Sequence, residues 1–337
     1  MRTELASDEV IDAAYSWLCH QRRHWPANSD VWEIRLRWSR VKRFIQTAIR
    51  HGDYRFSPML RVTKCNGEVV HVWSSRDALV LKSLAIVLAK YLPISECCTH
   101  VKGHGGAKAA VRRIQTHLPE YSFVMRTDVK AYYESIDQHQ MLEYLATYVE
   151  DRSVLNLLWQ AMRRTVTWGG LYWDRERGIS RGCPLSPLLG AFFLRELDIA
   201  VVRQGLFYVR FMDDILVLSP TRWKLRRAVR IVNGRLTATG LEKHPDKTFI
   251  GRIEKGFDFL GYYFSRGKLR LAVKTVRNFV ARFHRLYEQQ RTVPEGTVRL
   301  GKYVTRWLHW TRAGLSELAF SGEMSVLTIV EAETQKP

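Results

Sequence analysis

The stretch Phe211-Met212-Asp213-Asp214 constrains the fold more than any other part of the chain. It lies between the apolar runs 206–209 and 215–218, a pattern typical of two strands joined by a tight turn. An isolated pair of aspartates is more often an ordinary solvated turn. Adjacent carboxylates at the tip of a buried hairpin, however, repel each other unless a cation lies between them. Magnesium, a hard ion that prefers oxygen ligands, is the natural candidate.

A third carboxylate upstream supports the metal interpretation. Asp128 ends the run 123–127, which has the composition of a strand, and lies 85 residues before Asp213. Two acidic strand ends, one of them a doublet, are the minimum set for a two-metal phosphoryl-transfer centre, in which the ions lie roughly 3.5–4 Å apart. The pattern therefore predicts one catalytic site built from Asp128, Asp213 and Asp214.

Composition indicates a folded protein that binds nucleic acid. The chain has 337 residues, 46% of them hydrophobic, and Lys plus Arg exceed Asp plus Glu by 20, with an isoelectric point near 10.0. Basic residues occur along the whole chain, and 12% aromatic residues supply surfaces on which bases can stack. A merely cationic soluble protein is the alternative.

Cysteine spacing and hydropathy exclude several other classes. The five cysteines are odd in number and lack a paired CxxC motif, which argues against a zinc site and a disulfide framework. No run approaches about 18 uncharged apolar residues, and no signal sequence opens the chain. We therefore expect no membrane association and a cytoplasmic location.

The first hundred residues predict helices followed by a basic hairpin. Residues 8–50 show helical periodicity, and a further amphipathic helix is expected over 76–92. Between them, strand-like runs at 60–64 and 69–73 flank Asn66-Gly67, a typical hairpin turn. Lys64 on this hairpin can meet a triphosphate, although a plain solvated hairpin explains the pattern equally well.

Two loops rich in glycine suggest close contacts. Residues 102–108 precede a helical pattern over 109–114 and can let the backbone approach phosphates, but they do not form a P-loop. Residues 177–187 combine glycines and prolines before an apolar helix over 188–199. This second loop allows close approach to a ligand or strand, or serves as a rigid connector.

The remaining elements predict an α+β fold whose sheet carries the acids on one edge and is covered by helices. We expect helices at 138–149, 151–164, 221–236, 272–290 and 297–315, and strands at 247–250 and 257–264. The last two helices carry Arg282, Arg285 and Arg306, which suit contacts with a duplex backbone. About fifteen C-terminal residues lack periodicity and are expected to be disordered.

The order of these motifs resembles that of bacterial reverse transcriptases, most closely the group II intron and intron-like branch. The similarity covers residues 51–265, with a looser match to a helical thumb beyond. Residues 127–133 resemble the first catalytic motif, and 178–187 resemble the loop G-x-P-Q-G-x-x-x-S-P. The other matches are 211–214 to the YxDD box, 246–248 to the lysine motif, and 257–262 to FxFLGY.

The resemblance implies an α+β right-hand polymerase with fingers, a ferredoxin-like palm with an antiparallel sheet, and a helical thumb. N-terminal helices and fingers would occupy 1–120, and the palm 121–268, with its loop 169–187 packing on the fingers. The thumb would follow at 269–320, and a disordered tail at 321–337.

The resemblance also implies roles for individual residues. Asp128, Asp213, Asp214 and the main-chain carbonyl of Val129 would hold two Mg²⁺ ions, for which Mn²⁺ can substitute. The incoming dNTP would be bound by Lys64, Tyr133, Arg181 and Lys247, with the Tyr133 ring against the sugar. Lys247 would assist the leaving group or serve a structural role.

Three positions depart from the family pattern. Phe211 replaces the tyrosine of the box, His71 takes the place of an arginine usual on the second fingers strand, and Arg181 replaces the loop glutamine. Phenylalanine preserves packing without touching the metal ligands. The long cation of Arg181 puts substrate preference in question, because an amide is expected beside the nucleotide and template.

The resemblance implies an RNA-directed DNA polymerase that uses an RNA template, a DNA or RNA primer and dNTPs. Only about twenty residues follow the thumb, so we expect a free-standing enzyme without maturase or endonuclease domains. Phage defence, repair and service to a specific non-coding RNA are the roles considered. The alternatives are a polymerase-fold protein that acts as an RNA-binding module, and a nucleotide cyclase, which the +20 charge disfavours.

Overall fold

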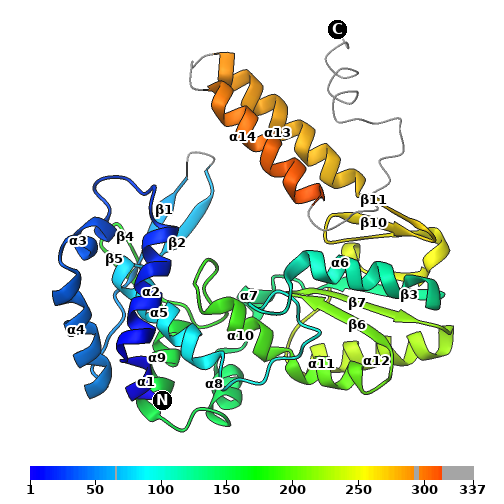
Figure 1. Ribbon diagram of the computed structural model, residues 1–337. Coiled ribbons are helices and arrows are strands. Elements are labelled where there is room, and N and C mark those ends of the chain that lie inside the picture. The colour runs from blue at the N-terminus through cyan, green and yellow to red at the C-terminus, as the bar shows by residue number, and fades with distance from the viewer. Residues whose placement is uncertain (65–66, 292–295, 313–337) are drawn as a thin grey trace. The chain divides into compact units, whose positions relative to one another are not determined.

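The computed structural model describes residues 1–64, 67–291 and 296–312 (Figure 1). Backbone contacts divide these residues into two compact units, and the chain passes between them several times. Unit 1 comprises Met1–Glu96, Val129–Ala200 and Val232–Lys243. Unit 2 comprises Cys97–Asp128, Val201–Ile231 and the described residues from His244 onward. The expected boundaries of fingers, palm and thumb remain a prediction.

Unit 1 begins with separate short helices where one helical region was expected over 8–50. The helices are α1 (Arg2–Leu5), α2 (Asp8–Gln21), α3 (Asp30–Leu36) and α4 (Trp38–His51). Ser7 caps α2, because its hydroxyl accepts the Val10 amide hydrogen at 3.3 Å. Gly52 ends α4 in the left-handed conformation, with φ 78°.

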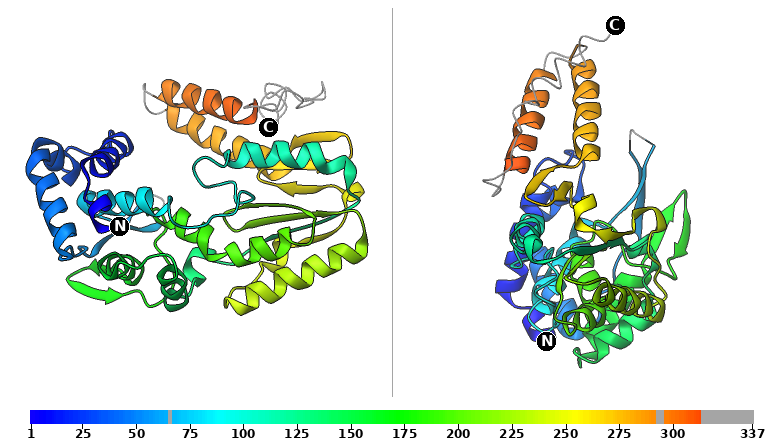
Figure 2. Two further views of the ribbon diagram at one scale, coloured as in Figure 1. Left: turned by 60° about the horizontal axis from the view of Figure 1, so that its bottom comes forward. Right: turned by 90° about the vertical axis from the view of Figure 1, so that its right-hand side faces the viewer.

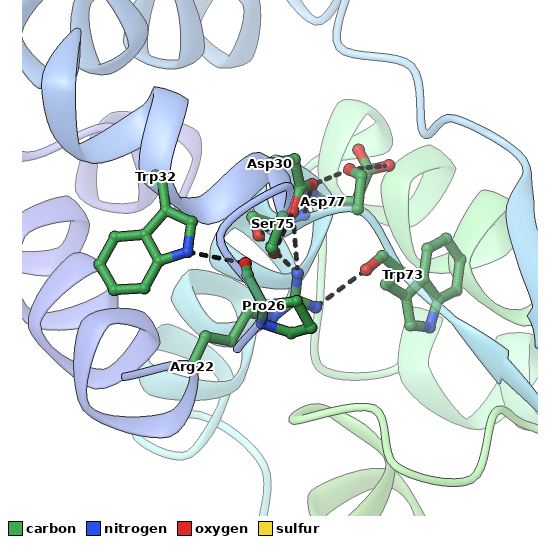
Figure 3. A network of polar contacts seen from close by, with 9 residues as sticks. Arg22, Pro26, Asp30, Trp32, Trp73, Ser75 and Asp77 are labelled. Carbon is green, nitrogen blue, oxygen red and sulfur yellow. Dashed lines mark hydrogen bonds and ion pairs between the residues drawn. The ribbon is translucent and has the colours of Figure 1, made fainter. Parts of the chain in front are cut away.

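A buried arginine joins the end of α2 and the start of α3 to α5 (Ser75–Leu88), as Figure 3 shows. Arg22 donates to the Trp73 carbonyl at 2.8 Å and to the Ser75 hydroxyl at 2.5 Å. Asp30 forms an ion pair with Arg22 at 3.5 Å and also accepts the Ser75 amide hydrogen. Burial lowers the pKa of Arg22, so these partners compensate a charge that has been removed from water.

The sheet of unit 1 has the strand order β2-β1-β4-β5. Its strands are β1 (Met59–Thr63), β2 (Val69–Val72), β4 (Thr165–Trp168) and β5 (Leu171–Asp174). Antiparallel pairing of β1 with β2 confirms the expected hairpin, although Asn66 of its turn lies outside the described residues. Strands β4 and β5 were both missed, because no element was assigned to 165–168 and 169–187 was interpreted as a loop.

Of the other helices of unit 1, those expected over 138–149 and 151–164 are present with shifted ends, whereas a short helix at Tyr132–Ser135 was not predicted. The helices are α7 (Tyr132–Ser135), α8 (Gln138–Ala146), α9 (Arg152–Arg163) and α10 (Ser186–Phe193). Asp137 and Asp151 accept amide hydrogens at the starts of α8 and α9. The single helix expected over 188–199 is wrong, since the chain breaks at Leu194 before α11 (Arg195–Val202).

The main sheet of unit 2 has the order β6-β7-β3-β8, with every neighbouring pair antiparallel. Its strands are β3 (Phe123–Asp128), β6 (Phe207–Phe211), β7 (Asp214–Ser219) and β8 (Phe249–Arg252). The hairpin predicted around Asp213 and Asp214 is confirmed as β6 and β7. Strand β8 starts two residues later than expected, because Pro245–Lys247 forms a 3-10 turn.

Helices cover both faces of this sheet (Figure 2). On one face, α6 (Gly106–His117) packs Ala110, Val111 and Ile114 into a core with Val124 and Leu216. On the other face lies α12 (Arg222–Ala238), whose Leu225 and Ala228 are buried while its arginines are exposed. The predicted α+β architecture is thus confirmed.

A smaller sheet in unit 2 replaces the single strand expected over 257–264. Strands β9 (Phe257–Phe259) and β10 (Tyr262–Ser265) pair antiparallel, and β11 (Lys268–Leu271) adds to β10. The chain reverses at Leu260 and Gly261, which adopt φ values of 48° and 85°. A left-handed leucine is uncommon, which explains why the sequence pattern did not reveal this turn.

Two long helices complete the described part of unit 2. They are α13 (Val273–Arg291) and α14 (Gly296–Arg312), and they confirm the helices expected there as far as residue 312. The Phe279 ring stacks on those of Trp307 and Tyr303, at 4.0 and 5.5 Å between centroids. The predicted tail, 321–337, lies outside the described residues. Over the ranges that the structure describes, no helix is both long and apolar enough to cross a membrane.

Candidate active site

Strand register brings two of the predicted catalytic carboxylates together. Asp128, the last residue of β3, is the direct partner of Asp214, the first residue of β7. Directly opposed residues in an antiparallel pair place their side chains on the same face of the sheet. On its other side Asp214 pairs with Phe211 of β6, so Phe211, Asp214 and Asp128 lie side by side across three neighbouring strands. The sheet therefore fixes the separation of residues that lie far apart in sequence.

The third carboxylate, Asp213, lies in the two-residue turn between β6 and β7. Its neighbour Met212 has φ 56°, a left-handed conformation that is uncommon for a residue other than glycine. The Asp213 carboxyl lies close enough to that of Asp128 for Asp128 to raise the pKa of Asp213. The turn thus joins all three acidic side chains in one cluster within unit 2.

Burial and mutual repulsion make this cluster electrostatically unusual. Burial, followed by the charges of Asp213 and Asp128, raises the pKa of Asp214 to about 7. Burial and the neighbouring Asp128 carboxyl raise the pKa of Asp213 to about 6. Lys247 acts in the opposite direction on both groups. Carboxylates perturbed in this way are typical of functional sites.

Lys247 lies beside the acids, as the lysine motif suggested. Its ammonium donates to Asp128 Oδ2 at 2.6 Å, and this hydrogen bond raises the pKa of Lys247. The 3-10 turn that carries it is attached to β3: the His244 amide donates to the Asp128 carbonyl at 2.7 Å. The hydroxyls of Thr127 and Thr248 are also 2.7 Å apart. Lys247 is therefore held in place by the same strand that holds the carboxylate.

The donor set suits a hard divalent cation, because all three side chains offer oxygen atoms and the raised pKa values reflect uncompensated charge. Across the described ranges, however, no group of three or more His, Cys, Asp or Glu side chains is arranged as a ready coordination shell. Lys247 instead contacts one of the predicted ligands, Asp128. The metal roles of the three aspartates and of the Val129 carbonyl remain predictions.

The predicted nucleotide-binding residues other than Lys247 belong to unit 1. Lys64 and Arg181 line a cavity of about 1030 Å³ that also includes His71. Both cations are exposed and form ion pairs within unit 1: Lys64 with Glu68 at 3.0 Å, and Arg181 with Glu134 at 3.3 Å. Burial and nearby arginines lower the pKa of His71. Two of the departures from the family pattern therefore lie in one basic cavity.

Tyr133 contacts both the loop 177–187 and helix α10. Its carbonyl accepts the Ile179 amide hydrogen at 2.7 Å. A Cβ atom at Gly178 would lie 2.6 Å from the Tyr133 carbonyl oxygen, and one at Gly190 would lie 2.9 Å from the Tyr133 ring. These two glycines are thus explained by contact with the chain itself.

Sequence reasoning missed the side chains that support this loop. Arg164 is largely buried and donates to the carbonyls of Met162 and Gly178 at 2.8 and 2.9 Å. Burial and neighbouring Arg175 lower the pKa of Arg164 to about 10. Gln138 also donates to the Gly178 carbonyl, at 2.9 Å. Nothing in the sequence distinguishes Arg164 from its neighbour Arg163.

The basic residues expected to contact a duplex are available on α13 and α14. Arg282, Arg285 and Arg306 are exposed, and Arg282 lies over the Tyr303 ring at 5.3 Å. The aromatic contacts between the two helices are made by other side chains, among them Phe279 and Trp307, so the three arginines remain exposed to solvent. Their role in binding nucleic acid remains a prediction.

Comparison with known proteins identifies the class. Residues 87–264 match the family described as reverse transcriptase (RNA-dependent DNA polymerase), and the chain belongs to this family. It is therefore by class an RNA-directed DNA polymerase, a nucleotidyltransferase. The expected similarity to the bacterial, group II intron-like branch is confirmed by its relatives.

Among the relatives, Protein YkfC of Escherichia coli K12 is 22% identical, over 81% of this chain and 86% of YkfC. Group II intron-encoded protein LtrA of Lactococcus lactis subsp. cremoris is 21% identical, over 58% of this chain and 34% of LtrA. An uncharacterized 91 kDa protein in the cob intron of Schizosaccharomyces pombe is 26% identical, over 47% and 20%. The chain thus spans most of YkfC but only about a third of LtrA.

A solved structure of apo telomerase from Candida tropicalis also resembles the chain. Its TM-score is 0.45 with 14% identity, over 59% of this chain and 45% of the telomerase chain. The assignment to the family comes from the sequence match and not from this similarity.

Proposed function

We propose that the chain copies an RNA template into DNA by adding dNTPs to a DNA or RNA primer, at a centre formed by Asp128, Asp213 and Asp214. One observation carries the proposal: strand register and a single turn gather these three acids, and two of them have strongly raised pKa values. Such a cluster costs stability, which a site for a divalent cation would explain.

Within this proposal the three aspartates hold two Mg²⁺ ions, or Mn²⁺ in their place. When bound, these ions supply activation of the primer 3′-hydroxyl and stabilise charge on the leaving pyrophosphate. Lys247 holds a proton at Nζ beside Asp128 and limits the repulsion within the cluster. The chain thus supplies both the carboxylates and a fixed positive charge.

The other predicted residues bind the substrates. Lys64 and Arg181 supply positive charge for the triphosphate, and the Tyr133 ring excludes a ribose 2′-hydroxyl. Arg282, Arg285 and Arg306 contact the backbone of the template–primer duplex. The exposure of these cations supports the assignments, because phosphate contacts require side chains that solvent can reach.

Primer extension on a homopolymer RNA template in Mg²⁺ tests the proposal. Asp213→Asn preserves side-chain volume and removes one carboxylate oxygen. The variant should lose several kcal/mol of transition-state stabilisation, so its rate of extension should fall steeply, while folding and RNA binding persist. Glu254→Gln is the control, since it removes an exposed charge in the same unit. Near-wild-type extension by Asp213→Asn would show that the catalytic assignment is wrong.

The same assay tests the alternative of an RNA-binding module. That function predicts tight RNA binding by the wild-type protein without extension in either Mg²⁺ or Mn²⁺. The ion pair between Lys247 and Asp128 favours this alternative only if the Lys247 ammonium prevents a divalent cation from binding to Asp128. Sequencing the nucleic acid that copurifies would distinguish phage defence, repair and a dedicated non-coding RNA.

A further inference from the structure

The segment 97–104 lies along the strand that leads into the catalytic turn. The Arg210 amide donates to the Cys97 carbonyl at 2.8 Å, and the Thr99 amide donates to the Arg210 carbonyl at 2.8 Å. Cys98 forms a parallel bridge with Arg210. These contacts extend the sheet beyond β6, one residue before Phe211, so the segment is positioned to act on the turn.

His100 reaches from this segment to the backbone of the turn. Its Nδ1 accepts the Met212 amide hydrogen at 2.9 Å, and its ring meets the edge of Phe211 at 5.9 Å between centroids. The amide N–H can only donate, so Nδ1 must be unprotonated in this contact. The thiol sulfur of Cys98 lies 3.4 Å from the same nitrogen. A neutral imidazole thus serves as the acceptor.

Arg210 binds the other backbone polar group of Met212, its carbonyl. This arginine is fully buried in β6, and its Nη1 donates to the Met212 carbonyl at 3.0 Å. Both backbone groups of Met212 are therefore bonded to side chains. Met212 has a left-handed backbone, φ 56°, which is unfavourable for a residue other than glycine and persists only where its surroundings impose it.

The glycine-rich stretch shapes the segment that carries His100. The Gly106 amide donates to the Thr99 carbonyl at 2.9 Å, and His104 Nδ1 lies 3.0 Å from the Cys98 carbonyl. Gly103 and Gly105 have φ values of 97° and 84°. This loop, which the sequence suggested for phosphates, folds back on itself and presents His100 to the turn.

We propose that His100 is a positioning residue for the Asp213 carboxylate. It does not touch the reacting groups; it fixes the Met212 amide, and thereby the conformation of the residue that precedes Asp213. The inference rests on the proposed function of the three aspartates. A displacement of about 1 Å in a catalytic group can cost about 100-fold in rate, so the contact has a measurable consequence.

Three substitutions separate the hydrogen bond from packing. His100→Phe retains a ring against Phe211 but has no acceptor. His100→Ala removes both the ring and the acceptor. His100→Asn restores an acceptor near the position of Nδ1. His51→Ala is the control, because His51 is exposed at the end of α4.

Two measurements are made on each variant: kcat and KM for primer extension in Mg²⁺, and deuterium uptake of a peptide that covers 207–216. For His100→Phe and His100→Ala we expect kcat to fall about 10- to 100-fold with KM for the template–primer nearly unchanged, and uptake to rise. His100→Asn should recover most of both properties. His51→Ala should match the wild-type protein.

Wild-type kcat and uptake in His100→Phe would overturn the proposal, as would equal impairment of His100→Phe and His100→Asn. Because deuterium uptake does not depend on catalysis, it tests the contact even if the wild-type protein fails to extend a primer. If the wild-type protein does not extend a primer but the variants show the expected uptake pattern, the hydrogen bond from Met212 to His100 is established. The proposed function, and with it the catalytic effect of that bond, is then wrong.

Discussion

Asp128 accepts a hydrogen bond from Lys247 at 2.6 Å, at the end of the strand whose register places it opposite Asp214. The cluster of acids therefore includes its own cation. Lys247 also lowers the pKa values of Asp213 and Asp214, although burial raises them by more. The balance leaves a site that is acidic, incompletely compensated and suited to a further positive charge.

Removal of this cation should make the carboxylates harder to ionise. For Lys247→Met we expect the acid limb of the pH–rate profile for primer extension to move to higher pH, and the rate at neutral pH to fall about tenfold, the equivalent of roughly one pKa unit. Lys247→Arg should retain most activity. Lys255→Met, at an exposed position in the same unit, is the control. An unshifted acid limb in Lys247→Met would remove Lys247 from the electrostatics of the site.

Asp214 should destabilise the metal-free protein at neutral pH. Its pKa is about 7 in the fold against 3.8 as the ordinary value, so the folded state favours the protonated form. The stability linked to this proton is complete below about pH 3.8 and is lost as the pH rises towards 7. Asp214→Asn should therefore raise the free energy of unfolding by on the order of 1–3 kcal/mol near pH 8, and by much less near pH 4.

Denaturant unfolding in EDTA at the two pH values measures this difference. Added Mg²⁺ should stabilise the wild-type protein more near pH 8 than near pH 4, because ligand carboxylates must be deprotonated. Asp214→Asn should lose most of that gain. A stability difference independent of pH would show that the environment of Asp214 is misassigned.

Duplex binding should depend strongly on salt through α13 and α14. Replacing Arg282, Arg285 and Arg306 with glutamine should make the negative slope of log K against log salt shallower, by about 0.9 for each lost phosphate contact. The matched control is a triple substitution of exposed arginines on α12, Arg222, Arg227 and Arg230. Equal slopes for the wild-type and first triple variant would exclude these two helices from the duplex-binding surface.

Sugar selection should depend on the ring of Tyr133. Tyr133→Ala should raise kcat/KM for ribonucleotides relative to deoxyribonucleotides, because a smaller side chain relieves a clash with the 2′-hydroxyl. Gly190→Ala should change the ratio as well, since its Cβ would lie 2.9 Å from the Tyr133 ring. An unchanged ratio in an active Tyr133→Ala variant would make Tyr133 a packing residue of unit 1.

The sequence predicted the acidic hairpin because two simple patterns coincided there. Apolar runs on both sides of Asp213 and Asp214 predicted β6 and β7, and composition alone marked the strand that ends at Asp128. Spacing could not show that Asp128 and Asp214 are register partners, because register depends on the assembled sheet.

Other features were hidden because they depend on tertiary contacts. Leu260 adopts a left-handed conformation that residue preferences disfavour, so β9 and β10 looked like one strand. His100 and Arg210 act through the backbone of Met212, and no local pattern links positions 100 and 212. The glycine-rich loop 102–108 was recognised from the sequence, but its role in presenting His100 follows only from the folded structure.

Asp128, the turn residue Asp213, and Asp214 at the start of β7 should act as one catalytic centre. Single-turnover extension of a labelled primer on an RNA template, with Asp128→Asn, Asp214→Asn and the double variant, tests it most directly. Residues that act as a unit are strongly non-additive, so each single variant should lose at least about 10³-fold and the double variant little more. Extension within tenfold of wild type by either single variant, or losses that multiply in the double variant, would show that these carboxylates do not act as one centre.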